Sequence, residues 1–339
     1  MKVVLDAVYN HTGREFFAFA DILENGEKSK YRDWYFIDGF PLKSEWGEIP
    51  NFKCFGYYGG MPKLNLKNPE VEKYITDVAC YWIKECDIDG WRLDVGDEIS
   101  HFFWKNFRKA VKAVKKDMLI IGEIWHYAGD FLEGDEWDTV MNYPFYLNLI
   151  DLLADEKITV SQFVQNLGYL KGRLHKNCYP LMWNLIDSHD TARFLHLCND
   201  NKKKQHLAAA FQLLLPGMPM IYYGDEYAMP GANDPDCRRG MYWDEEYQDK
   251  EMYEWYKRLI QVRKSHACIV EGELAGSVTE DEEGTVVLIR KNGEETIAMI
   301  FNCSSSAKKF NEYTEKYNLL TENTFDGNVE GFDAAVIVL

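Results

Sequence analysis

The sequence has little positive charge: 38 lysine and arginine residues stand against 55 aspartate and glutamate residues, for a formal net charge of −17 and a pI near 5.0. Such a chain repels phosphate backbones and anionic lipid, so neither nucleic acid nor a membrane is expected as a partner. No apolar run reaches the roughly 20 residues of a membrane span, and no signal-like segment opens the chain. These absences favour a neutral substrate and a cytoplasmic location.

Motifs for metals and nucleotides are also missing. The eight cysteines include no Cys-x-x-Cys pair and mostly stand among apolar residues, which indicates free thiols in a reducing compartment. No Gly-x-Gly-x-x-Gly or Walker loop follows a predicted strand, which argues against a nucleotide-binding sheet. What the chain does have is apolar material: 46% hydrophobic and 15% aromatic residues predict a sizeable core.

Strand and helix patterns alternate up to about residue 266. Buried-type strands are predicted at 2–5, 91–95, 119–124, 139–143, 181–186 and 220–223, and helices at 69–86, 100–116, 205–214 and 250–264. Asn68 and Pro69 begin the first helix as its cap and first-turn proline. The alternation predicts an α/β fold with a parallel sheet, and polar residues at the carboxyl ends of the strands favour a (β/α)8 TIM-type barrel.

The stretch 89–95 places Arg92 and Asp94 on one face of a strand, because side chains alternate along a strand. Alone, this pair would be interpreted as a structural ion pair. Three more apolar runs, however, also end in acidic and imidazole groups: Val3–His11, Leu119–His126 and Trp183–Asp190. Since the carboxyl ends of parallel strands meet at one edge, Asp94, Glu123 and Asp190 are expected to converge.

Three carboxylates at close range cannot all ionise cheaply, so we expect one to act as an acid while another stays a nucleophile. Retaining glycoside hydrolysis uses such a pair, with Arg92 holding the nucleophile ionised. The alternative within a barrel is a carboxylate-bound Mg²⁺ site of the enolase type, whose chemistry requires a lysine or histidine base on a strand. The aromatic-rich segment 13–66 favours sugar stacking, although its rings could equally pack a small core of their own.

Beyond residue 266 the pattern changes to short β-runs. Those at 285–290 and 296–302 are joined by a loop containing Asn292-Gly293, a hairpin signal. We therefore predict a catalytic barrel over 1–266, with an inserted loop-rich subdomain B at 13–66, followed by a carboxyl-terminal antiparallel β-sandwich over 267–339.

Several of these stretches resemble the α-amylase family, glycoside hydrolase family 13. Four are similar to its signature regions, in the family's order: Asp6–His11, Gly90–Val95, Gly122–His126 and Asn184–Thr191. Two further segments resemble the neopullulanase, cyclomaltodextrinase and maltogenic amylase subgroup in particular: Met61–Asn65 and Gly231–Arg239. The resemblance covers nearly the whole chain.

The resemblance implies a role for each matching residue. Asp94 would be the nucleophile, Glu123 the general acid/base, and Asp190 the carboxylate that grips sugar hydroxyls and stabilises the oxocarbenium-like state. The implied substrate-binding residues are His11, Arg92, Trp125, His126, His189, Asp234 and Arg238. Apart from the motifs, either His11 or His189 could equally be a structural histidine.

No cofactor is required on this interpretation, and no metal site is predicted. A calcium ion, bound in some relatives, would fall on Asn10. The opposing interpretation is that Asn10 and Asp6 brace the loop.

The implied reaction is retaining cleavage of α-1,4 and also α-1,6 glucosidic bonds in maltooligosaccharides, cyclodextrins or pullulan. If Val3–Leu5 matches the family's third strand, the chain holds strands 3 to 8 of the barrel, and we expect an amino-terminally truncated fragment with an incomplete barrel. A missing amino-terminal portion or a homodimer would then complete it. The alternative is an inactive fragment, or a remnant that binds oligosaccharide without cleaving it.

Overall fold

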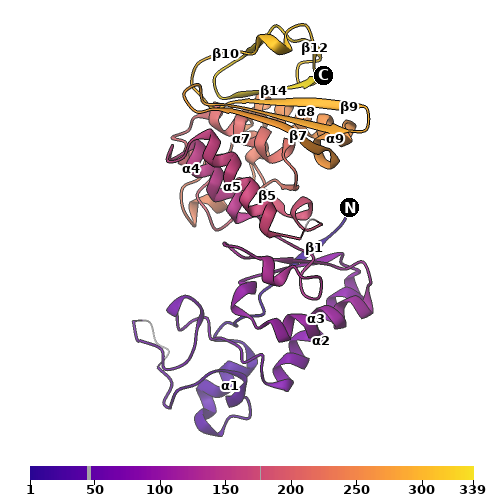
Figure 1. Cartoon of the computed structure of the whole chain (residues 1–339). Helices are drawn as coiled ribbons and strands as arrows, with labels where there is room; N and C mark the ends of the chain where they lie inside the picture. Colours follow the sequence, from indigo (N-terminus) through magenta and orange to yellow (C-terminus); the bar gives the residue numbers. More distant parts are fainter. Residues whose placement is uncertain (44–46, 176) are drawn as a thin grey trace. The chain divides into compact units, whose positions relative to one another are not determined.

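The computed structural model describes residues 1–43, 47–175 and 177–339, which form two compact units, Met1–Met141 and Asn142–Leu339 (Figure 1). Positions 44–46 of the predicted insertion, and residue 176, lie outside the described residues. The predicted domain boundary at residues 266 and 267 stays a prediction.

A four-stranded parallel sheet organises the first unit. Its order is β1-β2-β3-β4, and its strands are Val4–Ala7, Gly90–Leu93, Leu119–Gly122 and Thr139–Val140. All of β2 is buried, as expected of a central strand in a parallel sheet. The strands predicted at 91–95, 119–124 and 139–143 therefore exist, but each ends earlier than predicted because the next residues leave the ladder for loops.

Two helices accompany this sheet, α2 (Pro69–Cys86) and α3 (His101–Val114), and they lie side by side (Figure 1). The Asn68 side chain caps α2 by accepting a hydrogen bond from the Glu70 N–H, at 2.9 Å. Ser100 caps α3 in the same way. The buried positions of α2 recur every four residues: Val71, Ile75, Ala79 and Ile83. Both helices begin where the sequence predicts.

The insertion at 13–66 contains the helix α1 (Phe17–Asn25) and several single 3₁₀ turns. This helix is not predicted by the sequence, because no side chain caps it and no acidic residue opens its first turn. Rings within the insertion pack against each other: the centroid of Phe19 lies 5.0 Å from that of Tyr35 and 5.2 Å from that of Phe52. Those rings form a small core.

The second unit begins with a part that consists of helices and two parallel strands. Its elements are α4 (Tyr143–Leu153), α5 (Val160–Arg173), β5 (Trp183–Leu185), α6 (Phe194–Leu197), α7 (Lys202–Leu214), β6 (Met218–Met220), α8 (Lys250–Ser265) and α9 (Ala267–Glu271). β5 and β6 pair in parallel. The strand predicted at 220–223 is displaced: pairing with β5 ends at Met220, and the following residues turn toward Gly224, whose φ is 89°.

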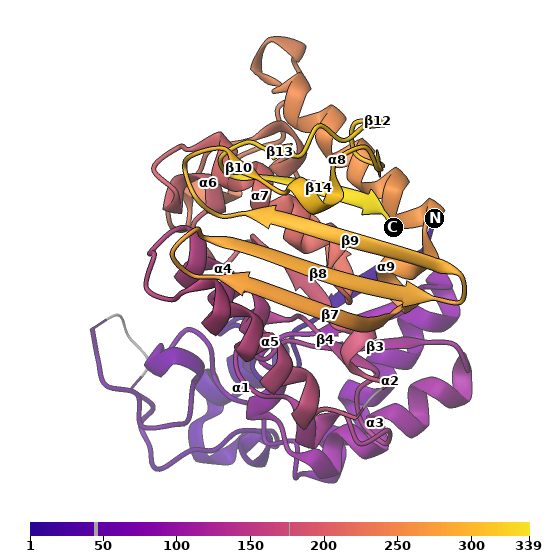
Figure 2. The same ribbon diagram turned by 45° about the horizontal axis from the view of Figure 1, so that its top comes forward.

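An antiparallel sheet of six strands completes the second unit, in the order β12-β11-β14-β9-β8-β7. The strands are β7 (Glu273–Glu280), β8 (Thr285–Asn292), β9 (Glu295–Asn302), β11 (Tyr317–Asn318), β12 (Asn323–Thr324) and β14 (Asp333–Val338), and β10 (Lys308–Lys309) pairs separately with β13 (Asn328–Val329). Figure 2 shows β7, β8 and β9 as the broad part of this sheet.

Both faces of this sheet are covered. Val286 and Leu288 pack in one core with α4, α5, α7 and α8, whereas Val287 packs on the opposite side with Phe310 and Phe325. The predicted hairpin is present: Asn292 pairs with Glu295, and Gly293 has the positive φ (61°) that a type II′ turn needs at its first central residue.

No helix among the described residues is both long and apolar enough to cross a membrane.

Candidate functional site

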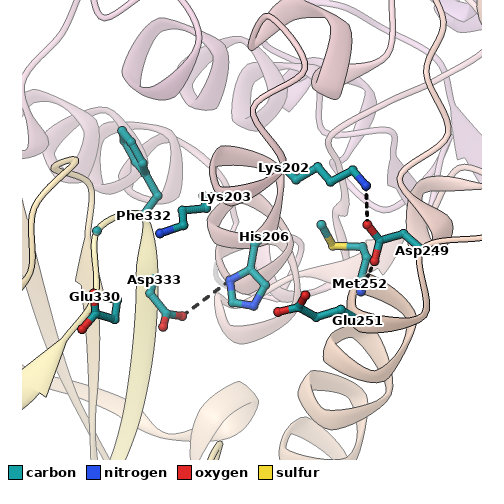
Figure 3. Close-up of a pocket in the computed structure, with 10 residues that line it drawn as sticks. Lys202, Lys203, His206, Asp249, Glu251, Met252, Glu330, Phe332 and Asp333 are labelled. Atoms are coloured by element: carbon teal, nitrogen blue, oxygen red, sulfur yellow. Dashed lines mark hydrogen bonds and ion pairs between the residues drawn. The ribbon is translucent and has the colours of Figure 1, made fainter.

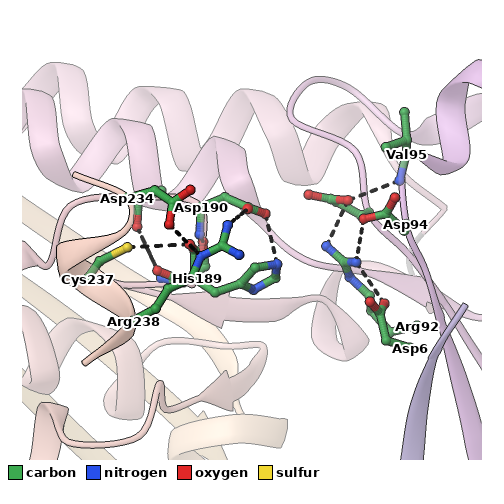
Figure 4. Close-up of polar contacts among 12 residues, drawn as sticks. Asp6, Arg92, Asp94, Val95, His189, Asp190, Asp234, Cys237 and Arg238 are labelled. Atoms are coloured by element: carbon green, nitrogen blue, oxygen red, sulfur yellow. Dashed lines mark hydrogen bonds and ion pairs between the residues drawn. The ribbon is translucent and has the colours of Figure 1, made fainter. Parts of the chain in front are cut away.

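In the first unit, the guanidinium of Arg92 gathers three carboxylates at the end of the parallel sheet (Figure 4). Its Nη1 lies 2.8 Å from Oδ1 of Asp6 and 2.9 Å from Oδ1 of Asp94, and its Nη2 lies 2.8 Å from Oε2 of Glu123. Asp6 is opposite Arg92 in the strand register, and Asp94 is two residues further along the same face. Arg92 and Glu123 are buried, and Asp94 remains partly exposed.

Glu123 has the surroundings of a carboxyl group that holds its proton. Burial raises its pKa, and this outweighs the opposing effects of the Arg92 cation and the Val95 N–H. Oε2 accepts a hydrogen bond from the Val95 N–H at 3.0 Å, and Oε1 accepts one from Nε1 of Trp125 at 3.3 Å. The group is therefore both fixed in orientation and biased toward its acid form.

Arg92 is a permanent cation. Burial alone would lower the pKa of its guanidinium, but Glu123, Asp6 and Asp94 together raise it above its usual value. The pair Asp94 and Glu123 thus shares one fixed positive charge. A carboxylate and a carboxylic acid on the same guanidinium can serve as nucleophile and proton donor.

His11 stands near this group. Burial lowers the pKa of His11, and the negative charges of Asp94 and Glu98 oppose that shift. Its ring stacks on Phe55, with centroids 5.2 Å apart. A neutral imidazole in this place can donate a hydrogen bond to a hydroxyl group. A cavity of about 720 Å³ lies in the same unit, lined by residues of the insertion, among them Lys63, together with Glu98.

Asn10, on which a calcium ion would fall, lies beside Glu98. Its Nδ2 donates to Oε2 of Glu98 at 3.2 Å, and Glu98 is also held by Nζ of Lys63 at 2.6 Å. Oδ1 of Asn10 is buried without a hydrogen-bond partner in the described structure. Calcium takes about six to eight oxygens, and no group of three acidic, cysteine or histidine residues suited to a metal occurs within residues 1–43, 47–175 and 177–339. The unpartnered Oδ1 of Asn10 and the carboxylate of Glu98 are oxygens of the kind that calcium binds, and a calcium role for Asn10 stays a prediction.

In the second unit, a separate polar group forms around Asp190 (Figure 4). Oδ2 of Asp190 lies 3.1 Å from Nε2 of His189, and Oδ1 lies 3.2 Å from Nη2 of Arg238. Nε of Arg238 in turn donates to the His189 carbonyl oxygen at 2.8 Å and lies 2.9 Å from Oδ1 of Asp234. The loops after β5 and β6 thus hold one another through a single arginine.

The structure therefore gathers the predicted site residues into two groups, one in each unit. His126 belongs to the first unit and contacts Oδ2 of Asp97 through Nε2, at 3.1 Å, outside the Arg92 group. Convergence of Asp190 with Asp94 and Glu123 stays a prediction.

Sequence reasoning missed a buried ionic cluster in the second unit, formed by Asp187, Arg193 and Asp225. All three are 0% exposed. An acidic residue that follows a barrel strand, as Asp225 and Glu226 do, is expected at the rim of the barrel, but Asp225 is completely buried. The available signal is an acidic residue after each of two paired strands, Asp187 after β5 and Asp225 after β6.

A second cavity, of about 340 Å³, is lined by residues of α7, the start of α8 and β14 (Figure 3). Nδ1 of His206 lies 3.5 Å from Oδ1 of Asp333. Burial lowers the pKa of His206 to about 4 and raises that of Asp333 to about 6. None of the predicted site residues lines this cavity. The ring of His206 also stacks on that of Trp255 in α8, with centroids 3.8 Å apart, so His206 joins α7 to α8 and, through Asp333, to the sheet.

Comparisons with known proteins identify the family of the chain. The family profile described as "Alpha amylase, catalytic domain" matches residues 1–272. A cyclomaltodextrinase of Geobacillus thermopakistaniensis is 46% identical over 307 residues, covering 91% of this chain and 52% of that protein. Neopullulanase 2 of Thermoactinomyces vulgaris is 42% identical over 303 residues, covering 89% of this chain and 51% of that protein.

Solved structures are similar as well. A cyclomaltodextrinase superposes with a TM-score of 0.94 at 37% identity, over 99% of this chain and 60% of that one. The cyclic α-maltosyl-(1→6)-maltose hydrolase from Arthrobacter globiformis gives 0.90 at 33% identity, over 100% of this chain and 75% of that one. The chain spans about half the length of the curated relatives it matches.

Proposed function

Because this chain belongs to the α-amylase family of glycoside hydrolases, we propose that it carries the catalytic residues of a retaining enzyme that cleaves α-1,4-glucosidic bonds in maltooligosaccharides and cyclodextrins. The observation that supports this most directly is the placement of Asp94 and Glu123 on one guanidinium, that of Arg92, with the pKa of Glu123 raised by burial.

The proposed reaction has two steps. In the first, an oxygen of Asp94 attacks the anomeric carbon while Glu123 gives its proton to the departing glycosidic oxygen, so that a glycosyl ester of Asp94 forms and the leaving sugar departs neutral. In the second, the ionised Glu123 takes a proton from water as the water oxygen attacks the same carbon, which releases Asp94 and restores Glu123 as an acid. Two inversions give net retention.

Within this proposal, Asp190 and His189 bind hydroxyl groups of the sugar being cleaved, as His11 does from the first unit. Trp125 and His126 would contact the leaving side, and Asp234 and Arg238 the non-reducing side. The proposal therefore includes the meeting of both groups at the carboxyl edge of one incomplete (β/α)8 barrel, of which the four-stranded and two-stranded parallel sheets are the pieces present.

The names of two relatives favour α-1,6 bonds as a further substrate class, since one is a neopullulanase and another a cyclic α-maltosyl-(1→6)-maltose hydrolase. A similarity to the intracellular maltogenic amylase of Bacillus subtilis, 42% identical over 89% of this chain, supports a place in cytoplasmic carbohydrate metabolism. A missing portion of the protein, or a second copy of the chain, is the proposed partner. No metal enters the reaction.

The test is sugar release from β- or γ-cyclodextrin by the purified 339-residue chain and its Glu123→Gln variant. General acid/base catalysis contributes about 10² to 10⁴-fold, so the variant should lose that much of the rate. An equal rate in both proteins would refute the role of Glu123. If both are folded and neither releases sugar, the second candidate holds: the chain is a non-catalytic fragment or an oligosaccharide-binding remnant.

A further inference from the structure

The buried ionic cluster of the second unit lies where two parallel strands end. Asp187 follows β5, Asp225 follows β6, and these strands pair through Leu185 and Met220. Neither carboxyl group has a part in the proposed reaction. Two acids and one arginine without solvent are costly to bury, so their presence calls for a physical account.

The contacts show what the cluster holds. Nη1 of Arg193 donates to Oδ1 of Asp225 at 3.0 Å, and the guanidinium lies over the ring of Tyr222, 4.5 Å from its centroid. Oδ1 of Asp187 accepts a hydrogen bond from the Phe194 N–H at 2.5 Å. This bond closes the segment 187–194, which carries both His189 and Asp190.

Inside that segment the chain is tied further. The Ser188 N–H donates to Oγ1 of Thr191 at 3.1 Å, and the Asp190 N–H donates to Oγ of Ser188 at 3.1 Å. Oγ of Ser188 also lies 3.1 Å from the hydroxyl of Tyr143. The place of Asp190 therefore depends on a loop whose two ends are joined by Asp187.

The charges of the cluster indicate that one of its two carboxyl groups is protonated. Two ionised carboxylates against one guanidinium would leave a net negative charge in a site without water. A side-chain hydrogen bond between Asp187 and Asp225 contributes to the pKa of both carboxyl groups, whereas Oδ2 of each has no donor among the other described residues. One proton shared by the two carboxyl groups balances the charge.

Burial also favours protonation, because it raises the pKa of Asp187 well above its usual value and that of Asp225 to about 7. The negative charge of Asp225 raises the pKa of Asp187 further. Besides Arg193, the titratable groups that face the pair from neighbouring elements are Tyr146, Cys198, Tyr222, Glu226 and Tyr256.

We propose that Asp187 and Asp225 hold a single proton between them at neutral pH, and that this acid–carboxylate pair, closed by Arg193, positions the segment carrying His189 and Asp190. The proton claim stands on the cluster alone. The positioning claim rests on the proposed function, because its consequence is the correct placement of two sugar-binding side chains.

The test compares Asp187→Asn with Asp187→Ala. An amide can replace the protonated carboxyl group, since its oxygen accepts from the Phe194 N–H and its NH₂ donates to Asp225. Asp187→Asn should therefore retain kcat/KM within about threefold, whereas Asp187→Ala should lose about 100-fold, the effect of misplacing a positioned group by about 1 Å. Equal kcat/KM in the two variants would overturn the positioning role.

Infrared spectroscopy at neutral pH tests the proton directly. The difference spectrum between the unaltered chain and Asp187→Asn, in which the band of Glu123 cancels, should contain the carbonyl stretching band of a buried protonated carboxyl group, and the same difference for the control Asp200→Asn, an exposed aspartate, should not. Absence of that band from the Asp187→Asn difference spectrum would overturn the shared proton.

The two claims remain separable from the proposed function. In a chain that releases no sugar, the infrared band still decides the proton. The NMR signal of the His189 imidazole then decides the positioning: it should be native in Asp187→Asn and shifted in Asp187→Ala. A native signal in both variants would contradict the positioning role.

Discussion

At the scale of single residues, the site depends on a backbone conformation that the sequence does not announce. Val95 has φ of 47°, in the left-handed region, where a β-branched side chain costs about 1–3 kcal/mol. The alternating pattern of 89–95 predicts a strand through Val95, but the strand ends at Leu93. The turn at Val95 directs its N–H to Glu123, so the strain serves the orientation of the proposed acid.

A prediction at this scale concerns the pH dependence of Glu123. The proton donor is lost as the pH rises through its pKa, which sets the alkaline limb of kcat/KM. The indole N–H of Trp125 lowers that pKa by stabilising the carboxylate. Trp125→Phe should therefore move the alkaline limb to higher pH, by up to about one unit, since a hydrogen bond to a charged group contributes about 1.5 kcal/mol.

The matched control for this pH profile is Trp82→Phe, at an exposed tryptophan on α2. It should leave the alkaline limb in place. A shift to lower pH in Trp125→Phe, or the same shift in both variants, would contradict the account of the Glu123 pKa.

At the scale of elements, helix termini supply specific signals. The Asn68 side chain accepts from the Glu70 N–H and donates to the Asp33 carbonyl oxygen, at 2.9 and 3.2 Å, so it both caps α2 and ties it to the insertion. Asn68→Ala should lower the free energy of unfolding by about 1 kcal/mol in urea denaturation. Asn311→Ala, at an exposed asparagine of a 3₁₀ turn, is the comparison and should change it little. If the two variants had the same free energy of unfolding, the stabilising role of the Asn68 cap would be contradicted.

The same signals explain which elements the sequence predicts. Helices α2 and α3 begin at capping residues, Asn68 and Ser100, and both are predicted, whereas α1 has no side-chain cap and is missed. The Asn292-Gly293 hairpin follows from turn chemistry alone. The ends of strands are harder to predict from the sequence, because pairing with a neighbouring strand decides them. β6 ends at Met220, where its pairing with β5 ends, although apolar residues continue beyond it.

In the candidate site, too, some features can be predicted from the sequence and others depend on tertiary packing. Strand periodicity is enough to predict that Arg92 and Asp94 share a face, and the structure has them 2.9 Å apart. The burial of Asp225 could not be predicted, because an acid after a strand is as consistent with an exposed position. Only tertiary packing against Arg193 and Tyr256 makes it internal.

At the scale of the whole molecule, family membership is confirmed, and the parallel sheets and the antiparallel sheet are of the predicted kinds. Closure of a barrel and the meeting of Asp190 with Asp94 and Glu123 are proposals. The net charge of −17 fits a neutral substrate better than an anionic one, because an anion would be repelled on approach. The central claim for the molecule is that Asp94 forms a covalent bond to the sugar.

That claim is tested most directly by trapping the intermediate. Incubating the chain with a fluorinated α-glucosyl fluoride, which slows release of the covalent sugar, and digesting it for mass spectrometry should add one glycosyl group to the peptide that contains Asp94. Asp94→Asn, handled in parallel, should gain none. A label on another residue, or sugar release with inversion and no adduct, would contradict the account.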